Sequence, residues 1–94
     1  MPYIKQVLQT QENSMNGWAN WETWNVSLWI NNDEPTYRLA VEYVEQSRLF
    51  GKKISYDDLI PALEYRFGQM TPDGCRWMDA KINTDEMDEM LSEL

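Results

Sequence analysis

Histidine is absent from this chain of 94 residues, and cysteine occurs once, as Cys75. The absence of histidine removes the commonest general base and the commonest zinc ligand of proteins. A single cysteine excludes an internal disulfide, and without histidine it cannot form a Cys–His nucleophile pair. We therefore expect no catalytic residue, no metal site and no cofactor site, and we predict that the chain is not an enzyme.

Long apolar runs and basic residues are also scarce. No stretch approaches the roughly 20 apolar residues of a membrane-spanning helix, and the first residues lack the apolar segment of a signal peptide. Eight Lys and Arg residues stand against sixteen Asp and Glu, which gives a net charge of -8. Long-range repulsion then disfavours nucleic acids and anionic membranes as partners. The sequence predicts a cytoplasmic protein that binds a basic protein surface.

Tryptophan, in contrast, is abundant in one short segment. Four of the five Trp residues lie between Trp18 and Trp29. Large aromatic rings contribute much of the packing energy of a core or an interface, so this run is expected to organise the fold. At least two of Trp21, Trp24 and Trp29 are expected in the core. Trp18 follows Gly17 at the edge of the run, and we expect it to remain partly exposed.

The same run carries the signal for a first helix. Asn20 is a favourable N-cap residue, and Trp21 to Ile30 can follow it as a helix whose core side holds Trp21, Trp24 and Leu28. A strand is the alternative, because apolar residues also alternate strictly here. We favour the helix because the next segment is helical. The alternating residues are Trp24, Val26, Leu28 and Ile30.

Two further helices are predicted in the middle of the chain. Asp33 and Pro35 suit the start of a helix that runs to about Phe50 and stops at Gly51. The next helix begins at Ser55 or Asp57 and stops at Gly68. Its apolar residues recur at helical spacing, which predicts a core-facing stripe of Tyr56, Leu59, Ile60, Leu63 and Phe67.

The last helix follows a turn. Thr71-Pro-Asp-Gly74 predicts a turn, and the stretch 75–78 after it fits an extended conformation. Asn83 and Glu86 form a capping box, and Met87, Met90, Leu91 and Leu94 form the apolar stripe of the helix that follows. The fold class predicted is therefore mostly α, a small single-domain bundle of about four helices. Residues 16–94 form this domain, and residues 1–15 form an N-terminal arm.

Acidic residues are concentrated at the C-terminus. Residues 79–94 contain six acids and one base, Lys81. An acidic helix of this kind can occupy a basic cleft that otherwise receives phosphates, and such docking is salt-dependent. An ordinary solvated acidic face is the alternative. The partner-binding residues we predict are Asp85, Glu86, Asp88, Glu89 and Glu93, together with Trp18.

The run Asn20-Trp-Glu-Thr-Trp-Asn-Val-Ser-Leu-Trp-Ile30 resembles a motif of a family of small uncharacterised proteins from bacteriophages, plasmids and bacteria. The family motif is close to Asn-Tyr-Glu-Thr-Trp-Asn-Val-Ala-Leu-Trp-Ile/Leu, and this chain has Trp21 where Tyr is usual. Thr71-Pro-Asp-Gly74, Trp77, Asp79 and the closing Met-Leu-Ser-Glu-Leu resemble the C-terminal half of the family. The resemblance covers about residues 16–94, and it implies a mobile genetic element rather than an activity.

These features together predict a non-catalytic, acidic protein-binding module. Its sharpest form is a phage-encoded inhibitor of a host defence or nucleic-acid-handling enzyme, of the anti-CRISPR or anti-restriction type, acting as a nucleic-acid mimic in one version. The alternative is a phage adaptor or modulator of host metabolism or proteolysis that binds through an aromatic surface. Salt separates the two hypotheses, because charge-led docking weakens steeply with ionic strength and an apolar dock does not.

Overall fold

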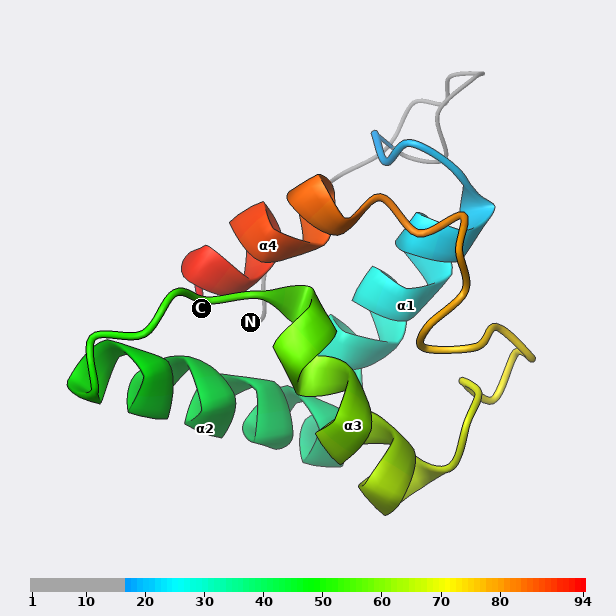
Figure 1. Cartoon of the computed structure of the whole chain (residues 1–94). Helices are drawn as coiled ribbons and strands as arrows, with labels where there is room; N and C mark the ends of the chain where they lie inside the picture. Colours follow the sequence, from blue (N-terminus) through cyan, green and yellow to red (C-terminus); the bar gives the residue numbers. More distant parts are fainter. Residues whose placement is uncertain (1–16) are drawn as a thin grey trace.

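Four helices pack together in the computed structural model, which describes residues 17–94 (Figure 1). They are α1 (Trp21–Asn32), α2 (Glu34–Leu49), α3 (Tyr56–Phe67) and α4 (Thr84–Ser92). No sheet forms among the described residues, where an isolated antiparallel bridge joins Met70 and Arg76. The predicted small, mostly α bundle is confirmed. The predicted arm, residues 1–15, lies outside the described residues.

The start of α1 is fixed by the predicted cap. The Asn20 side-chain oxygen accepts hydrogen bonds from the Thr23 N–H at 2.9 Å and from the Thr23 hydroxyl at 2.6 Å. The helix prediction for the tryptophan run is thus confirmed over the strand alternative. The next helix follows almost at once, because Asp33 ends α1 and also caps α2 by accepting a 3.4 Å hydrogen bond from the Thr36 N–H. The Thr36 hydroxyl donates to the same oxygen at 2.6 Å.

The C-terminus of α2 is closed by a Schellman motif. The Lys52 N–H donates to the Ser47 carbonyl at 2.7 Å, and the Gly51 N–H donates to the Arg48 carbonyl at 3.2 Å. Gly51 has φ +67°, a conformation that side chains other than glycine rarely adopt. The predicted stop at Gly51 is confirmed. The chain then turns back sharply toward α3 (Figure 1).

The first residue of α3 is held by α4 and by the loop that precedes α4. Ser55 precedes α3 but makes no side-chain cap hydrogen bond. The Asp88 carboxylate of α4 instead accepts a 2.7 Å hydrogen bond from the Tyr56 N–H. Tyr56 also contacts the loop between α3 and α4, because its buried hydroxyl donates to the Trp77 carbonyl at 2.6 Å. Burial raises the pKa of Tyr56 far above its usual range, so its hydroxyl stays protonated.

The core lies between the four helices and includes the segment between α3 and α4. The α4 stripe is confirmed, since Met87, Met90 and Leu91 are buried. In α3 the predicted stripe is also confirmed, with Ile60 and Phe67 partly buried at its edges. Trp77 has the largest of the fully buried side chains. The other buried apolar residues are Trp18, Val26, Ile30, Ala40, Val44, Tyr56, Leu59, Leu63, Cys75 and Ile82.

The core-facing side predicted for α1 is wrong for Trp21, which is 37% exposed. Trp24 and Trp29 are partly buried and pack against the core, so two of the three tryptophans contact it as expected. Leu28 is partly buried.

The two apolar residues of α1 that are buried are Val26 and Ile30. The rest of the buried side is polar and consists of Thr23, Asn25, Ser27 and Asn31. The prediction failed because it assumed an apolar buried face, whereas most buried side chains of this face are polar. Thr23 and Asn25 bond to other segments, and Ser27 and Asn31 bond to carbonyls of α1 itself.

Candidate functional site

A hydrogen-bond seam, buried at Asn25 and Thr71 and exposed at Asp73, joins α1 to the loop that follows α3. The Asn25 side chain accepts from the Thr71 hydroxyl at 2.7 Å and donates to the Asp73 carboxylate at 2.8 Å. The Trp29 indole N–H donates to the same carboxylate oxygen at 2.8 Å. The Thr71 hydroxyl oxygen in turn accepts from the backbone N–H of Cys75 at 3.2 Å. The Thr-Pro-Asp-Gly turn is thereby fixed against the tryptophan helix.

The two donors on Asp73 have an electrostatic consequence. Hydrogen bonds from Asn25 and Trp29 stabilise the ionised carboxylate and lower the pKa of Asp73 from its usual value. The same donors orient the indole ring of Trp29, which is partly buried. Asp73 therefore has a structural role as an anchor for the loop.

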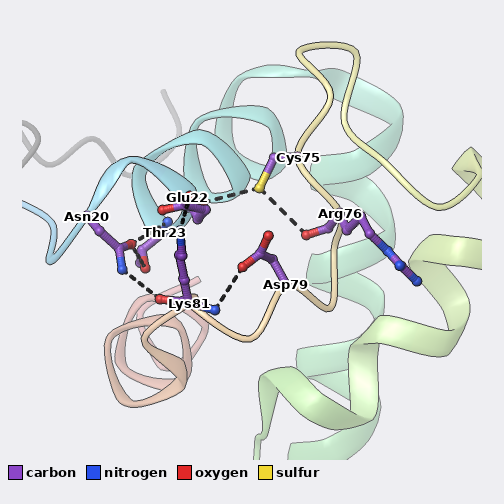
Figure 2. A network of polar contacts seen from close by, with 7 residues as sticks. All are labelled: Asn20, Glu22, Thr23, Cys75, Arg76, Asp79 and Lys81. Atoms are coloured by element: carbon purple, nitrogen blue, oxygen red, sulfur yellow. Dashed lines mark hydrogen bonds and ion pairs between the residues drawn. The ribbon is translucent and has the colours of Figure 1, made fainter.

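A second polar network joins the beginning of α1 to the segment before α4 (Figure 2). The Asn20 amide donates to the Lys81 carbonyl at 2.6 Å. The Thr23 hydroxyl accepts a 2.8 Å hydrogen bond from the Asn83 N–H. Thr23 therefore contacts the N-cap residues of two helices, Asn20 of α1 and Asn83 of α4. Together the two networks tie the loop between α3 and α4 to α1 at both ends.

Cys75 lies at the centre of this loop and is 3% exposed. Its thiol faces the Glu22 and Arg76 carbonyl oxygens at 3.8 and 3.6 Å (Figure 2). Desolvation, with Asp79 and Glu22 adding negative potential, raises the pKa of Cys75 to about 11. A protonated, buried thiol is a poor nucleophile and a poor metal ligand. Cys75 is thus a packing residue.

The acids of α4 fall into two groups. Glu86 accepts a 2.9 Å hydrogen bond from the Ala19 N–H, and Asp88 caps α3 through Tyr56. Both side chains are half-buried. Asp85, Glu89 and Glu93 are exposed. The sequence pattern presents the five acids as equivalent, but two of them hold the fold together and three face solvent.

Trp18, the sixth predicted interface residue, has a different environment from the one expected. It is 3% exposed and belongs to the core, so the prediction of partial exposure is wrong. Its neighbour Ala19 is fastened to α4 by Glu86. This attachment brings the segment before α1 onto the bundle, which the sequence position of Trp18 at the edge of the run did not indicate.

A cavity of about 280 Å³ opens where α1, α2 and the end of α3 meet. Three aromatic rings line it, those of Trp29, Phe67 and Trp77. Asp33 and Thr36, at the junction of α1 and α2, supply its polar groups. This cavity could not be predicted from the sequence, because its wall combines residues from three helices and a loop.

Comparison with known proteins places the chain in a family. A model of the family DUF7249 matches residues 11–94. The chain belongs to DUF7249. This family is one of unknown function. No curated protein and no solved structure matches the chain. The match agrees with the resemblance to an uncharacterised family and supports neither a particular motif nor a phage origin.

None of the helices between residues 17 and 94 is long and apolar enough to cross a membrane. In the same part of the chain, no group of three or more Cys, Asp or Glu side chains is placed to hold a metal ion.

Proposed function

We propose that this chain is a non-catalytic binding protein whose acidic α4 surface docks on a basic surface of another protein. The α4 surface is defined by the exposed acids Asp85, Glu89 and Glu93. Inhibition of a host defence or nucleic-acid-handling enzyme by a phage-encoded protein is the biological form we propose, with α4 occupying a site that otherwise receives phosphates.

The observation that carries this proposal is that no acid of α4 forms an ion pair among the described residues. Within residues 17–94 the ion pairs are Arg38 with Glu34 at 2.8 Å and Lys81 with Glu22 at 4.0 Å. Neither pair includes an acid of α4. Unpaired charges of one sign raise the encounter rate with an oppositely charged surface and reject partners of like charge.

The α4 surface is also held rigidly. Its opposite side is the buried stripe of Met87, Met90 and Leu91. The Arg48 guanidinium of α2 donates to the Ser92 and Leu94 carbonyls at 2.7 and 3.2 Å. A cation at this end suits the helix dipole and satisfies carbonyls that have no partner within the helix. A pre-organised helix loses less entropy when it binds.

The test is capture of a partner from a bacterial lysate with charge-reversed variants. The variant Asp85→Lys/Glu89→Lys/Glu93→Lys spares Glu86 and Asp88, so we expect it to fold. The matched control is Glu42→Lys/Glu45→Lys/Asp58→Lys, which reverses three exposed acids on α2 and α3 and changes net charge equally.

We expect the α4 variant to lose the captured protein and the control to retain it. Loss in both variants would mean that only total charge matters, and retention in both would refute the α4 surface. The competing hypothesis, an adaptor that binds through its aromatic edge, used Trp18 as the contact. Because Trp18 is buried, it is not accessible as the contact residue that this hypothesis requires.

A further inference from the structure

The cavity between Trp29, Phe67 and Trp77 has a chemistry that points to a positively charged guest. Its accessible apolar wall consists of the partly buried rings of Trp29 and Phe67 together with Met70 and Pro72. Trp77 also lines the cavity but is 1% exposed. Aromatic faces carry negative electrostatic potential and attract ammonium and guanidinium groups, as in the aromatic cages that bind methylated lysine. An aromatic wall of this composition therefore suits a cation whose stem is apolar.

The polar side of the cavity adds a carboxylate. Asp33 lines the cavity and is half-buried. One of its oxygens accepts hydrogen bonds from the Thr36 N–H at 3.4 Å and from the Thr36 hydroxyl at 2.6 Å. Asp33 lies between the last residue of α1 and the first residue of α2. The negative end of the α1 dipole and the positive end of the α2 dipole therefore meet at this residue. The Asp33 carboxyl is the acidic group that lines the cavity.

The walls of the cavity are held in place before any ligand arrives. Trp29 is oriented by its 2.8 Å hydrogen bond to Asp73. Trp77 is 1% exposed and fixed in the core. Phe67 closes α3, and the Arg66 guanidinium lies 5.8 Å from its ring centre. This distance is within the range of a cation–π contact with the Phe67 ring.

We propose that the cavity receives the charged end of one lysine or arginine side chain from a basic protein surface. The volume of about 280 Å³ lies just below the range of about 300–1,000 Å³ for drug-sized ligands and suits a single side chain. The net charge of -8 and the carboxylate of Asp33 select a cation over a neutral apolar group. That this side chain comes from a docked basic protein is an inference that rests on the proposed function.

The experiment titrates the folded protein with N-acetyl-arginine amide and N-acetyl-lysine amide while the indole N–H resonances are followed by NMR. The neutral probe for comparison is N-acetyl-norleucine amide. We expect saturable shifts of the Trp29 and Trp77 resonances with both cationic probes. Affinity for norleucine amide should be lower by about fivefold or more, the size of a modest cation–π contribution.

Two variants sharpen the result. Asp33→Asn keeps a favourable N-cap for α2 and removes the charge, so it should weaken binding of the cationic probes severalfold and leave norleucine amide unchanged. Arg66→Gln removes the competing guanidinium and should strengthen binding of the cations. Asp58→Asn, an exposed acid elsewhere on α3, is the control and should change neither.

The proposal is overturned if norleucine amide binds as tightly as the cations, because the cavity would then be merely apolar. It is equally overturned if no probe gives saturable shifts in the folded protein up to roughly 50 mM. Either result leaves the proposed function standing when the α4 charge reversals still abolish capture. Conversely, cation binding that persists in the α4 variant supports the cavity independently of any partner.

Discussion

Helices α1 and α4 bury their inner sides in opposite ways. Between its caps, α4 buries only apolar side chains, those of Met87, Met90 and Leu91. The buried side of α1 consists mainly of polar residues that surround Val26 and Ile30. An apolar stripe is visible in the sequence as a period, whereas a polar buried face is recognised only when its partners are known. This difference explains why the buried face of α4 could be predicted from the sequence and the buried face of α1 could not.

The partners of α1 also lie far away in the chain. Asn25 meets Thr71 and Asp73, and Thr23 meets Asn83. Buried polar groups cost free energy unless they are hydrogen-bonded, so these contacts must form together with the bundle. We infer that the polar side of α1 specifies where the loop between α3 and α4 lies, while the apolar side of α4 supplies packing energy.

The largest effect is expected on the apolar side. Met87 is fully buried, and Met87→Ala should lower the free energy of unfolding by about 2–5 kcal/mol, through lost transfer energy and an unfilled cavity. Urea denaturation measures the change. Glu89→Ala, an exposed position on the same helix, should stay within about 0.5 kcal/mol of the parent. Equal effects at both positions would contradict the packing assigned to α4.

The polar side of α1 should show a smaller effect with strong coupling. Asn25→Ala leaves the buried Thr71 hydroxyl without its acceptor, which should cost about 1–3 kcal/mol. A double-mutant cycle with Thr71→Val should give a coupling energy of at least about 0.5 kcal/mol. Asn32→Ala, an exposed asparagine of α1 that bonds only locally, is the control. Additive effects of Asn25→Ala and Thr71→Val would show that the seam does not act as a unit.

The acids of α4 should separate by their contacts. Asp88→Ala removes the acceptor for the Tyr56 N–H and should cost about 0.5–2 kcal/mol, as expected for a lost helix cap. Glu93→Ala should leave the melting temperature nearly unchanged, because Glu93 is exposed. If both substitutions were neutral, the division of these acids into structural and solvent-facing groups would be wrong.

The smallest effect concerns pH. The pKa of Asp73 is lowered in the folded state, so its stabilisation is present above the unfolded pKa of about 3.9 and is lost as pH falls through the folded value. Urea midpoints of the parent and of Asp73→Asn should therefore differ at neutral pH and converge below about pH 4. A difference that stays constant down to pH 2 would exclude this carboxylate as the cause.

The fold could be predicted from the sequence wherever caps and apolar periods coincide. Asn20, Asp33 and Asn83 each cap the helix expected of them, and Gly51 ends α2 as expected. Exposure within the tryptophan run could not be predicted. Trp18 lies outside any helix, so no period applied to it, and its burial follows from tertiary packing.

The candidate site was predictable only in part. The acidic surplus of α4 is a property of composition and was visible at once. The capping of α3 by Asp88 and the contact of Glu86 with Ala19 are tertiary contacts between segments that lie far apart in the sequence. The aromatic cavity required three helices and a loop in their final positions.

The most direct test of the central claim, that the exposed acids of α4 lead docking, is the association rate of the captured partner as a function of ionic strength. For the parent chain we expect the rate to fall steeply between low and physiological salt. For Asp85→Lys/Glu89→Lys/Glu93→Lys the rate at low salt should be at least about tenfold slower and nearly independent of salt, while the dissociation rate changes less. Identical association rates and salt dependence for the two proteins would contradict the account.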